Sequence, residues 1–236
     1  MDRKKIFSLS LDIAQGLIKY GAEISRAEET VKRINTAHGN ECYVFALPTL
    51  IIAQCGEETQ IRRIKPSETN LSELVRLNSI SRRLCFEKNR EPANIGKHLY
   101  PIYIDIISIF ASSAFFSLYF GGNVTDALFS GIIGLVISYS GSKMIRLPQF
   151  SSNLVSSFIA GALSFIPQKF GMNVQPDKII IGTIMMLVPG LTVVNAIRDM
   201  MNSDLVAGII ELADAIMSAL GIAFGVAGAL ILMNII

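Results

Sequence analysis

The chain has 236 residues, of which 51% are hydrophobic and only 17% are charged, and its formal net charge is +2. Soluble domains usually carry about 25% charged residues, so the composition argues against an ordinary soluble protein. The small net charge, without a basic stripe interleaved with aromatic residues, gives no sign of a nucleic-acid partner. Residues 1–98 hold 16 Lys and Arg against 12 Asp and Glu, whereas residues 99–236 hold 5 against 7. This division predicts a cytosolic domain over 1–98 and a transmembrane helical domain over 99–236.

Two amphipathic helices are predicted at the start of the chain. The first covers residues 3–20, because apolar residues recur at steps of three and four: Ile6, Leu9, Ile13, Leu17 and Tyr20. Gly21 interrupts it. Ser25 and Glu28 have the spacing of a capping box and predict the start of a second helix, which Gly39 ends.

A small antiparallel sheet is expected next. Residues 42–55 are rich in Val, Phe, Ile and Leu with Pro48 in the middle, which favours an edge or a break. A turn at 56–58 leads into a returning strand at 59–64. A last helix at 71–86 completes an α+β domain, whose end is marked by Glu91-Pro92.

The cysteines and histidines predict neither disulfide nor metal. Cys42, Cys55 and Cys85 are odd in number and have no metal-ligand spacing, so reduced thiols are expected. His38 and His98 are isolated. The sequence contains no nucleotide-binding glycine motif, so neither ATP nor any other cofactor is expected.

The second domain contains five apolar segments in close succession. A helix needs about 20 residues to cross the hydrocarbon core, and spans are predicted at about 101–121, 124–145, 150–170, 179–197 and 205–236. The excess of basic residues before the first span places the N-terminus in the cytosol, and five spans place the C-terminus outside. With five spans, Lys169 and Lys178 lie on the outer side, against the positive-inside rule. Four or six spans therefore remain alternatives.

Two motifs, one in each domain, resemble the N-terminal half of the threonine/serine exporter family. The first runs from Gly21 to Thr30 with Arg33-Ile34 following, and the second runs from Leu187 to Asp199 with Asp204 and Gly208 following. The resemblance covers essentially the whole chain and implies a subunit of a secondary transporter in the cell inner membrane. It implies export of threonine, serine or a related carboxylate, acting with a separate small hydrophobic second half. It also implies a functional role for Glu23, Arg26 and Glu29.

Several polar residues of the membrane domain are candidates for the transport site. Pro189 and Gly190 break span four, and broken helices in transporters expose backbone groups near the midplane; a simple kink is the alternative. Arg198 can take a substrate carboxylate through two parallel hydrogen bonds, and Asn195 shares a helix face with Asp199. Pairing of Arg198 with Asp199 or Asp204 is the alternative.

Each of the remaining polar positions has a structural explanation besides a functional one. Asp105 lies about one turn into span one, where a carboxylate is a functional candidate unless it snorkels to the surface. Asp126 and Asn123 are expected to be solvated loop residues. In span five, a four-residue alanine repeat and the pair Gly221 and Gly225 predict close helix packing, within the chain or against a partner.

The alternative to transport is a membrane-tethered enzyme or a regulatory protein whose cytosolic domain binds a ligand. Helical spacing and helix caps account for most of the acidic residues that such an enzyme would use, so no catalytic residue and no enzyme activity is predicted.

Overall fold

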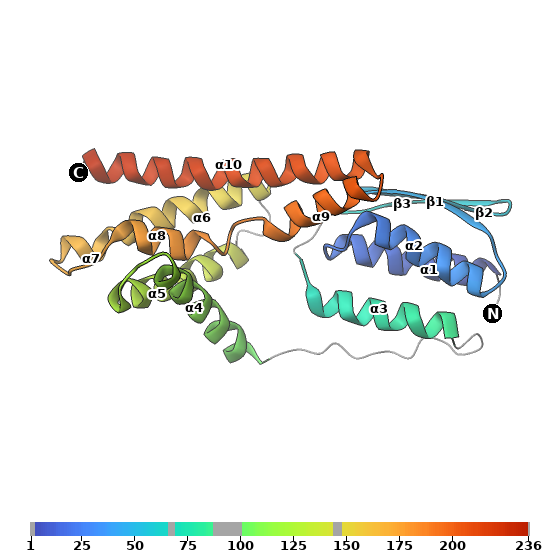
Figure 1. The fold of residues 1–236 in the computed structure, drawn as a ribbon, viewed down its shortest axis with the longest axis horizontal. Helices are drawn as coiled ribbons and strands as arrows, with labels where there is room; N and C mark the ends of the chain where they lie inside the picture. Colours follow the sequence, from blue (N-terminus) through green and yellow to red (C-terminus); the bar gives the residue numbers. More distant parts are fainter. Residues whose placement is uncertain (1–2, 66–68, 87–100, 144–147, 236) are drawn as a thin grey trace. The chain divides into compact units, whose positions relative to one another are not determined.

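The computed structural model describes residues 3–65, 69–86, 101–143 and 148–235, and it divides into two compact units (Figure 1). The first unit comprises Met1–Leu99 and Leu191–Ala213, and the second comprises Tyr100–Gly190 and Asp214–Ile236. The longest helix, α10 (Leu205–Ile235), contributes residues to both. The predicted domain end at Glu91-Pro92 lies outside the described residues.

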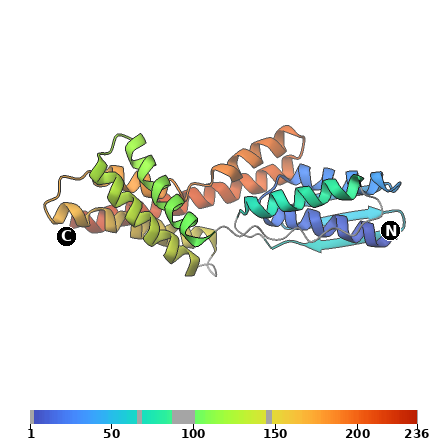
Figure 2. The same cartoon turned by 90° about the horizontal axis from the view of Figure 1, so that it is seen from below.

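Three helices of the first unit have nearly the predicted bounds, and a fourth comes from the segment predicted to continue the fourth span. They are α1 (Arg3–Lys19), α2 (Ile24–Ala37) and α3 (Leu71–Phe86), joined by α9 (Gly190–Met201) from later in the chain. Helix α3 packs against α1 and α2, and α2 packs against the sheet (Figure 2). Their apolar faces meet in one core, and removal of this surface from water drives the packing. Fully buried members of the core include Phe7, Leu11, Leu17, Ile24, Ile34 and Ile51.

The sheet has three antiparallel strands in the order β1-β2-β3. They are β1 (Cys42–Leu47), β2 (Leu50–Cys55) and β3 (Glu58–Arg63). The stretch around Pro48 is therefore a hairpin of two strands with a two-residue connection. A second tight turn, in which Gly56 has φ of 64°, connects β2 to β3. The predicted antiparallel unit is confirmed.

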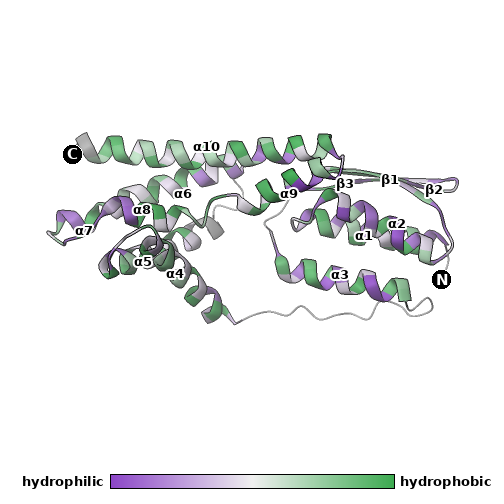
Figure 3. Ribbon diagram, in the orientation of Figure 1, coloured by the Kyte–Doolittle hydropathy of each residue, from purple (hydrophilic) through white to green (hydrophobic). Residues whose placement is uncertain are grey.

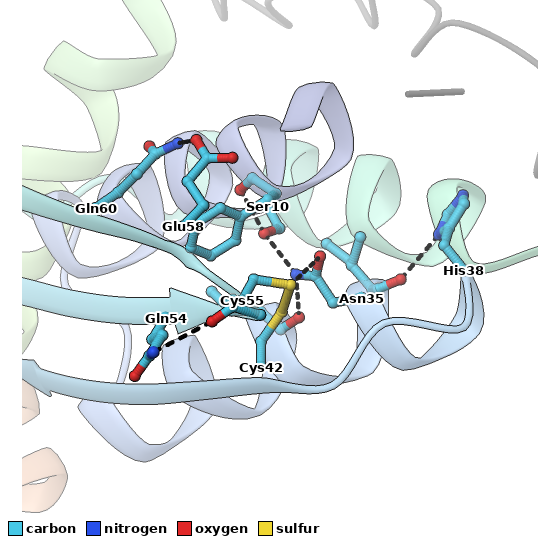
Figure 4. The surroundings of a disulfide bond; sticks show 12 residues. Ser10, Asn35, His38, Cys42, Gln54, Cys55, Glu58 and Gln60 are labelled. Atoms are coloured by element: carbon cyan, nitrogen blue, oxygen red, sulfur yellow. Dashed lines mark hydrogen bonds between the residues drawn. A yellow bond between two sulfur atoms is a disulfide. The ribbon is translucent and has the colours of Figure 1, made fainter. Parts of the chain in front are cut away.

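A disulfide joins Cys42 and Cys55, which face each other across the β1–β2 pair (Figure 4). Their Cα atoms are 4.3 Å apart. The neighbouring Asn35 side chain donates to Ser10 Oγ at 2.8 Å and to the carbonyl of Val31 at 2.9 Å. The expectation of three reduced thiols is wrong for these two cysteines, because the hairpin register places them opposite each other; Cys85 is free.

The described part of the second unit is helical. It contains α4 (Ile102–Tyr119), α5 (Val124–Lys143), α6 (Gln149–Ser164), α7 (Ile166–Lys169), α8 (Pro176–Ile184) and the later part of α10. A small apolar core is built from α5, α6, α8 and the loop before α8, around Ile133, Ile137, Ala160, Val174 and Ile179.

Among the described residues, three helical segments are long and apolar enough to cross a membrane. They are Ile102–Tyr119, Gln149–Lys169 and Leu205–Met233, and Val124–Ser140 is a shorter apolar helix. Figure 3 shows the hydrophobic residues that cover most of α10, in contrast to the mixed surfaces of α1 and α2. The predicted fourth span is not one helix. Helix α8 ends at Ile184 and α9 begins at Gly190, so the expected break before Gly190 is present and is longer than a kink.

Glycines allow the helices of the second unit to approach closely. A Cβ on Gly182 of α8 would lie 2.8 Å from the carbonyl oxygen of Ser113 in α4. A Cβ on Gly221 of α10 would lie 2.7 Å from the carbonyl oxygen of Phe150 in α6, and one on Gly225 would collide with Ser157 and Leu154. Such small-residue contacts replace hydrophobic burial as the source of helix association in lipid. The Gly221/Gly225 pair therefore packs within the chain, as one of the two predicted possibilities.

Candidate functional site

The N-terminus of α2 is capped by a residue from a distant part of the sequence. The first amides of a helix have no partner within the helix, and Glu23 at the N-cap position makes no side-chain cap. Asp199 of α9 supplies both acceptors: Oδ2 accepts from the Ile24 amide at 3.1 Å and Oδ1 from the Ser25 amide at 3.2 Å. The carboxylate is fully buried, and its charge favours the positive end of α2.

The capping box predicted from Ser25 and Glu28 is wrong, because Asp199 caps this helix instead. Ser25 lies inside the first turn of α2, and its hydroxyl accepts from Asn202 Nδ2 at 3.2 Å. Glu28 instead accepts from the Ala46 amide of β1 at 2.7 Å. Burial raises the pKa of the Glu28 carboxyl above its ordinary value of 4.5, against the opposing effects of that hydrogen bond and of Lys32.

One further polar contact fixes α9 against the loop before α2, and two others, both made by Asp204, join α9 to the start of α10. Asn195 Nδ2 donates to the carbonyl of Gly21 at 3.0 Å. After α9, the Asp204 amide donates to the carbonyl of Asp199 at 2.9 Å, and Asp204 Oδ1 accepts from the Ala207 amide at 3.4 Å near the start of α10. Residues of both motifs that carried the family resemblance therefore form one hydrogen-bonded cluster within the first unit, although about 175 positions separate them. Residues 187–190 of the second motif belong to the second unit.

Arg198 forms an ion pair with Glu23 at the edge of this cluster. The Arg198 side chain is 56% exposed, whereas that of Glu23 is 14% exposed. An ion pair this open to solvent contributes little to stability. A guanidinium has five N–H donors in a planar fork, and the described contacts use Nη1 alone. The arrangement can therefore orient Arg198 while leaving donors for an external carboxylate.

The other predicted site residues are exposed or belong to the second unit. Arg26 and Glu29 are exposed on α2. Pro189 and Gly190 lie in and at the end of the break between α8 and α9, and the Gly190 amide donates to the carbonyl of Val188 at 2.8 Å. Asp105 is exposed in the first turn of α4. Thus Glu23, Asn195, Arg198 and Asp199 are brought together, while Asp105, Pro189 and Gly190 belong to the second unit.

Asp126 of α5 was expected to be solvated, and this is wrong. It is fully buried, and it accepts from the Asn123 amide and from the Gln175 amide, both at 2.8 Å. One carboxylate therefore joins the α4–α5 turn to the loop before α8. The signal was visible in the sequence, since an acidic residue in the first turn of an apolar helix favours an amide-rich environment.

A cluster of hydroxyl groups inside the second unit was not predicted. Ser113 and Ser117 of α4, Ser130 of α5 and Thr183 of α8 are all buried. Ser130 donates to the Ser113 carbonyl at 2.9 Å and lies 3.3 Å from Thr183 Oγ1. The glycines around them leave little space, so the cluster functions as a polar helix contact. Among the residues that the structure describes, no group of His, Cys, Asp and Glu is placed to hold a metal ion.

Comparison with known proteins places the chain in a transporter family. An uncharacterized protein of Schizosaccharomyces pombe is 26% identical over 178 residues, which are 68% of this chain and 21% of that protein. The chain thus spans about a fifth of the length of this curated relative. No solved structure matches. The ThrE family, described as "Putative threonine/serine exporter", matches residues 8–233. This range includes both motifs of the cluster, and the match over most of the chain shows that the chain belongs to the ThrE family.

Proposed function

We propose that this chain is one half of a secondary transporter that exports threonine, serine or a related small carboxylate. The observation that carries the proposal is the cluster that joins Glu23 to Arg198 in a chain of the exporter family. Arg198 receives the substrate carboxylate, because its guanidinium is more than half exposed and matches a carboxylate in shape and charge. Asn195 and Asp199 use their side chains on backbone groups, so we assign them the task of positioning Arg198.

We further propose five membrane spans, with the domain of residues 1–98 in the cytosol. The carboxylate of Asp126 supports this arrangement, because it ties the turn after α4 to the loop before α8. Both connections then lie at one end of the unit, as an up-and-down order of α4, α5, α6 and α8 requires. The fourth span, at about 179–197, combines α8, the break at Pro189-Gly190 and the start of α9, and its freed backbone groups face the transport path. Asp105 lies at the cytosolic entrance of the first span.

An odd number of spans places the two ends of the chain on opposite sides of the membrane. A second half of similar build would then have inverted topology, and inverted pairs place the substrate site at their interface. We infer that this half works with a second hydrophobic membrane half. A reporter enzyme that is active only outside the cell should be active when fused to the C-terminus. Activity there of a reporter that works only in the cytosol would overturn the five-span topology.

Substitution of Arg198 tests its proposed role. Arg198→Lys keeps the charge and loses the planar fork, so threonine or serine efflux from cells should fall, and Arg198→Ala should reduce it further. Arg76→Lys is the matched control, because Arg76 is also paired with a glutamate, Glu73, at 2.8 Å but lies on α3. Normal efflux in Arg198→Ala at equal membrane abundance would remove Arg198 from the site.

A further inference from the structure

The disulfide of the first unit lies where its two cysteines stay neighbours whether or not they are bonded. Cys42 begins β1 and Cys55 ends β2, and the antiparallel register pairs them directly. Their Cα atoms are 4.3 Å apart, close to the ~4.5 Å of antiparallel pairs that do not exchange backbone hydrogen bonds. The rest of the ladder and the buried residues Ile51 and Ala53 also hold this hairpin in place. The register therefore keeps the two thiols together after reduction.

A buried amide beside the disulfide is oriented by the contacts of its nitrogen (Figure 4). Asn35 is fully buried, and its Nδ2 donates to Ser10 Oγ at 2.8 Å and to the carbonyl of Val31 at 2.9 Å. Ser10 Oγ donates its own proton to the carbonyl of Phe7 at 2.7 Å, so it acts as an acceptor for Asn35. These contacts leave Asn35 Oδ1 facing Cys55 Sγ at a distance of 3.9 Å.

The Asn35 oxygen has a donor only when the disulfide is open. Among the contacts of the described residues, Asn35 Oδ1 accepts from no N–H or O–H group, and a sulfur atom in a disulfide carries no proton. A buried acceptor without a donor destabilises the state in which it occurs. The thiol of a reduced Cys55 can donate to this oxygen. The core around Asn35 therefore pairs its polar groups completely in the dithiol state.

The two sulfur atoms differ in their access to solvent. Cys42 is partly exposed between the exposed residues Glu41 and Tyr43, whereas Cys55 is only 3% exposed and belongs to the apolar core. A thiol exchanges with a disulfide by direct attack on one of its sulfur atoms, so access decides which sulfur reacts. An external thiol can reach Cys42, and Cys55 is then the sulfur that is released beside Asn35.

We propose that Cys42 and Cys55 form a redox-active pair that exchanges with a low-molecular-weight thiol and its disulfide. The small thiolate forms a bond to Cys42 Sγ, and the bond between the two cysteines breaks with its electron pair on Cys55, which takes a proton from water. A second small thiolate attacks the sulfur of the first and releases Cys42 as a thiolate. Two small thiols are thereby oxidised to one disulfide and the protein is reduced to the dithiol. The small disulfide oxidises the protein by the same steps in reverse.

The pair goes beyond the proposed function and uses none of the residues assigned to substrate binding. In the cytosol, where we place residues 1–98, disulfides are usually transient and serve catalysis or redox sensing. This location supports the proposal, although the exchange itself requires only the access of a small thiol to Cys42.

Thiol counting on the purified full-length chain tests the exchange. A Cys85→Ser background leaves only the two cysteines of the pair. The chain is treated without denaturant with glutathione disulfide, then with reduced glutathione, then with glutathione disulfide again. After each step glutathione is removed, and the chain is denatured in an alkylating reagent and its mass is measured. The expected numbers of alkylated thiols are none, two and none. A bond that reduced glutathione opens only in denaturant, or that does not form again, would overturn the proposal.

Two single-cysteine variants in the same background assign the exchanging sulfur. With Cys55→Ser, the partly exposed Cys42 should gain the mass of one glutathione from glutathione disulfide under native conditions. Cys42→Ser is the matched control, because its remaining Cys55 lies in the core and should stay unmodified until the chain is denatured. Equal modification of the two variants, or no modification of Cys42, would overturn the assignment. Because the readout is the mass of the chain and not transport, failure of the export proposal leaves this result unaffected.

Discussion

Replacement of Asp199 by alanine should loosen the start of α2, which lies 175 positions away in the sequence. The change removes the acceptors of two amides, those of Ile24 and Ser25, in a position closed to solvent. Loss of a helix cap costs about 0.5–2 kcal/mol, and a partly buried charge at a helix end contributes up to about 2 kcal/mol. The combined loss is about 0.5–4 kcal/mol. Asp199→Asn keeps one acceptor without the charge and should lose about half as much.

Hydrogen–deuterium exchange of the peptide around residues 21–30 measures this effect directly. A loss of 2 kcal/mol corresponds to exchange about 30-fold faster, if the amides exchange by local opening. Asp12→Ala is the control, because Asp12 is 57% exposed and forms only a surface ion pair with Arg62 at 3.5 Å. If Asp199→Ala exchanges no faster at residues 21–30 than Asp12→Ala does, the cap is not what holds α2 to α9.

Three other features give measurable expectations. Gly225→Val should lower the melting temperature in detergent, because its side chain would enter α6 at Ser157 and Leu154. Ala219→Val, at an exposed position of the same helix, should leave the melting temperature unchanged. Equal effects of the two substitutions would contradict the packing of α10 on α6. Because burial raises the Glu28 pKa, the folded state binds the proton more tightly than the unfolded state, and stability should rise as pH falls through the folded pKa toward 4.5. Glu28→Gln should remove this pH dependence of the stability. If the stability of Glu28→Gln changes with pH as that of the parent does, groups other than Glu28 cause the dependence. Denatured without reductant, the protein should expose the Cys85 thiol alone; three reactive thiols would disprove the disulfide.

The sequence predicted the elements well wherever one period dominated. The spacing from Ile6 to Leu17 specified α1, and residues 71–86 specified α3, because a single apolar face was buried in each. The disulfide was not predicted because residues 42–55 form two strands that meet at Pro48-Thr49, whereas their composition indicates a single apolar stretch. A two-residue hairpin connection at Pro48-Thr49 would have placed Cys42 opposite Cys55.

The candidate site was predicted in its residues and not in its contacts. Arg198 and Asp199 follow each other in the chain, yet helical geometry points them in different directions. The Asp199 carboxylate is buried against the N-terminus of α2, whereas Arg198 pairs with Glu23. These partners are about 175 positions away, and neither spacing nor periodicity carries information at that distance. The family resemblance identified both motifs, and only the fold brought them together.

Reconstitution in liposomes tests the transporter half most directly. The purified chain should be inserted into liposomes alone and together with a hydrophobic protein that is proposed as its second half. Uptake of labelled threonine, serine and a dicarboxylate should then be measured. The account predicts flux of at least one of these compounds with both halves, and none with either half alone. Robust flux from this chain alone would contradict the claim that it supplies only half of the pathway.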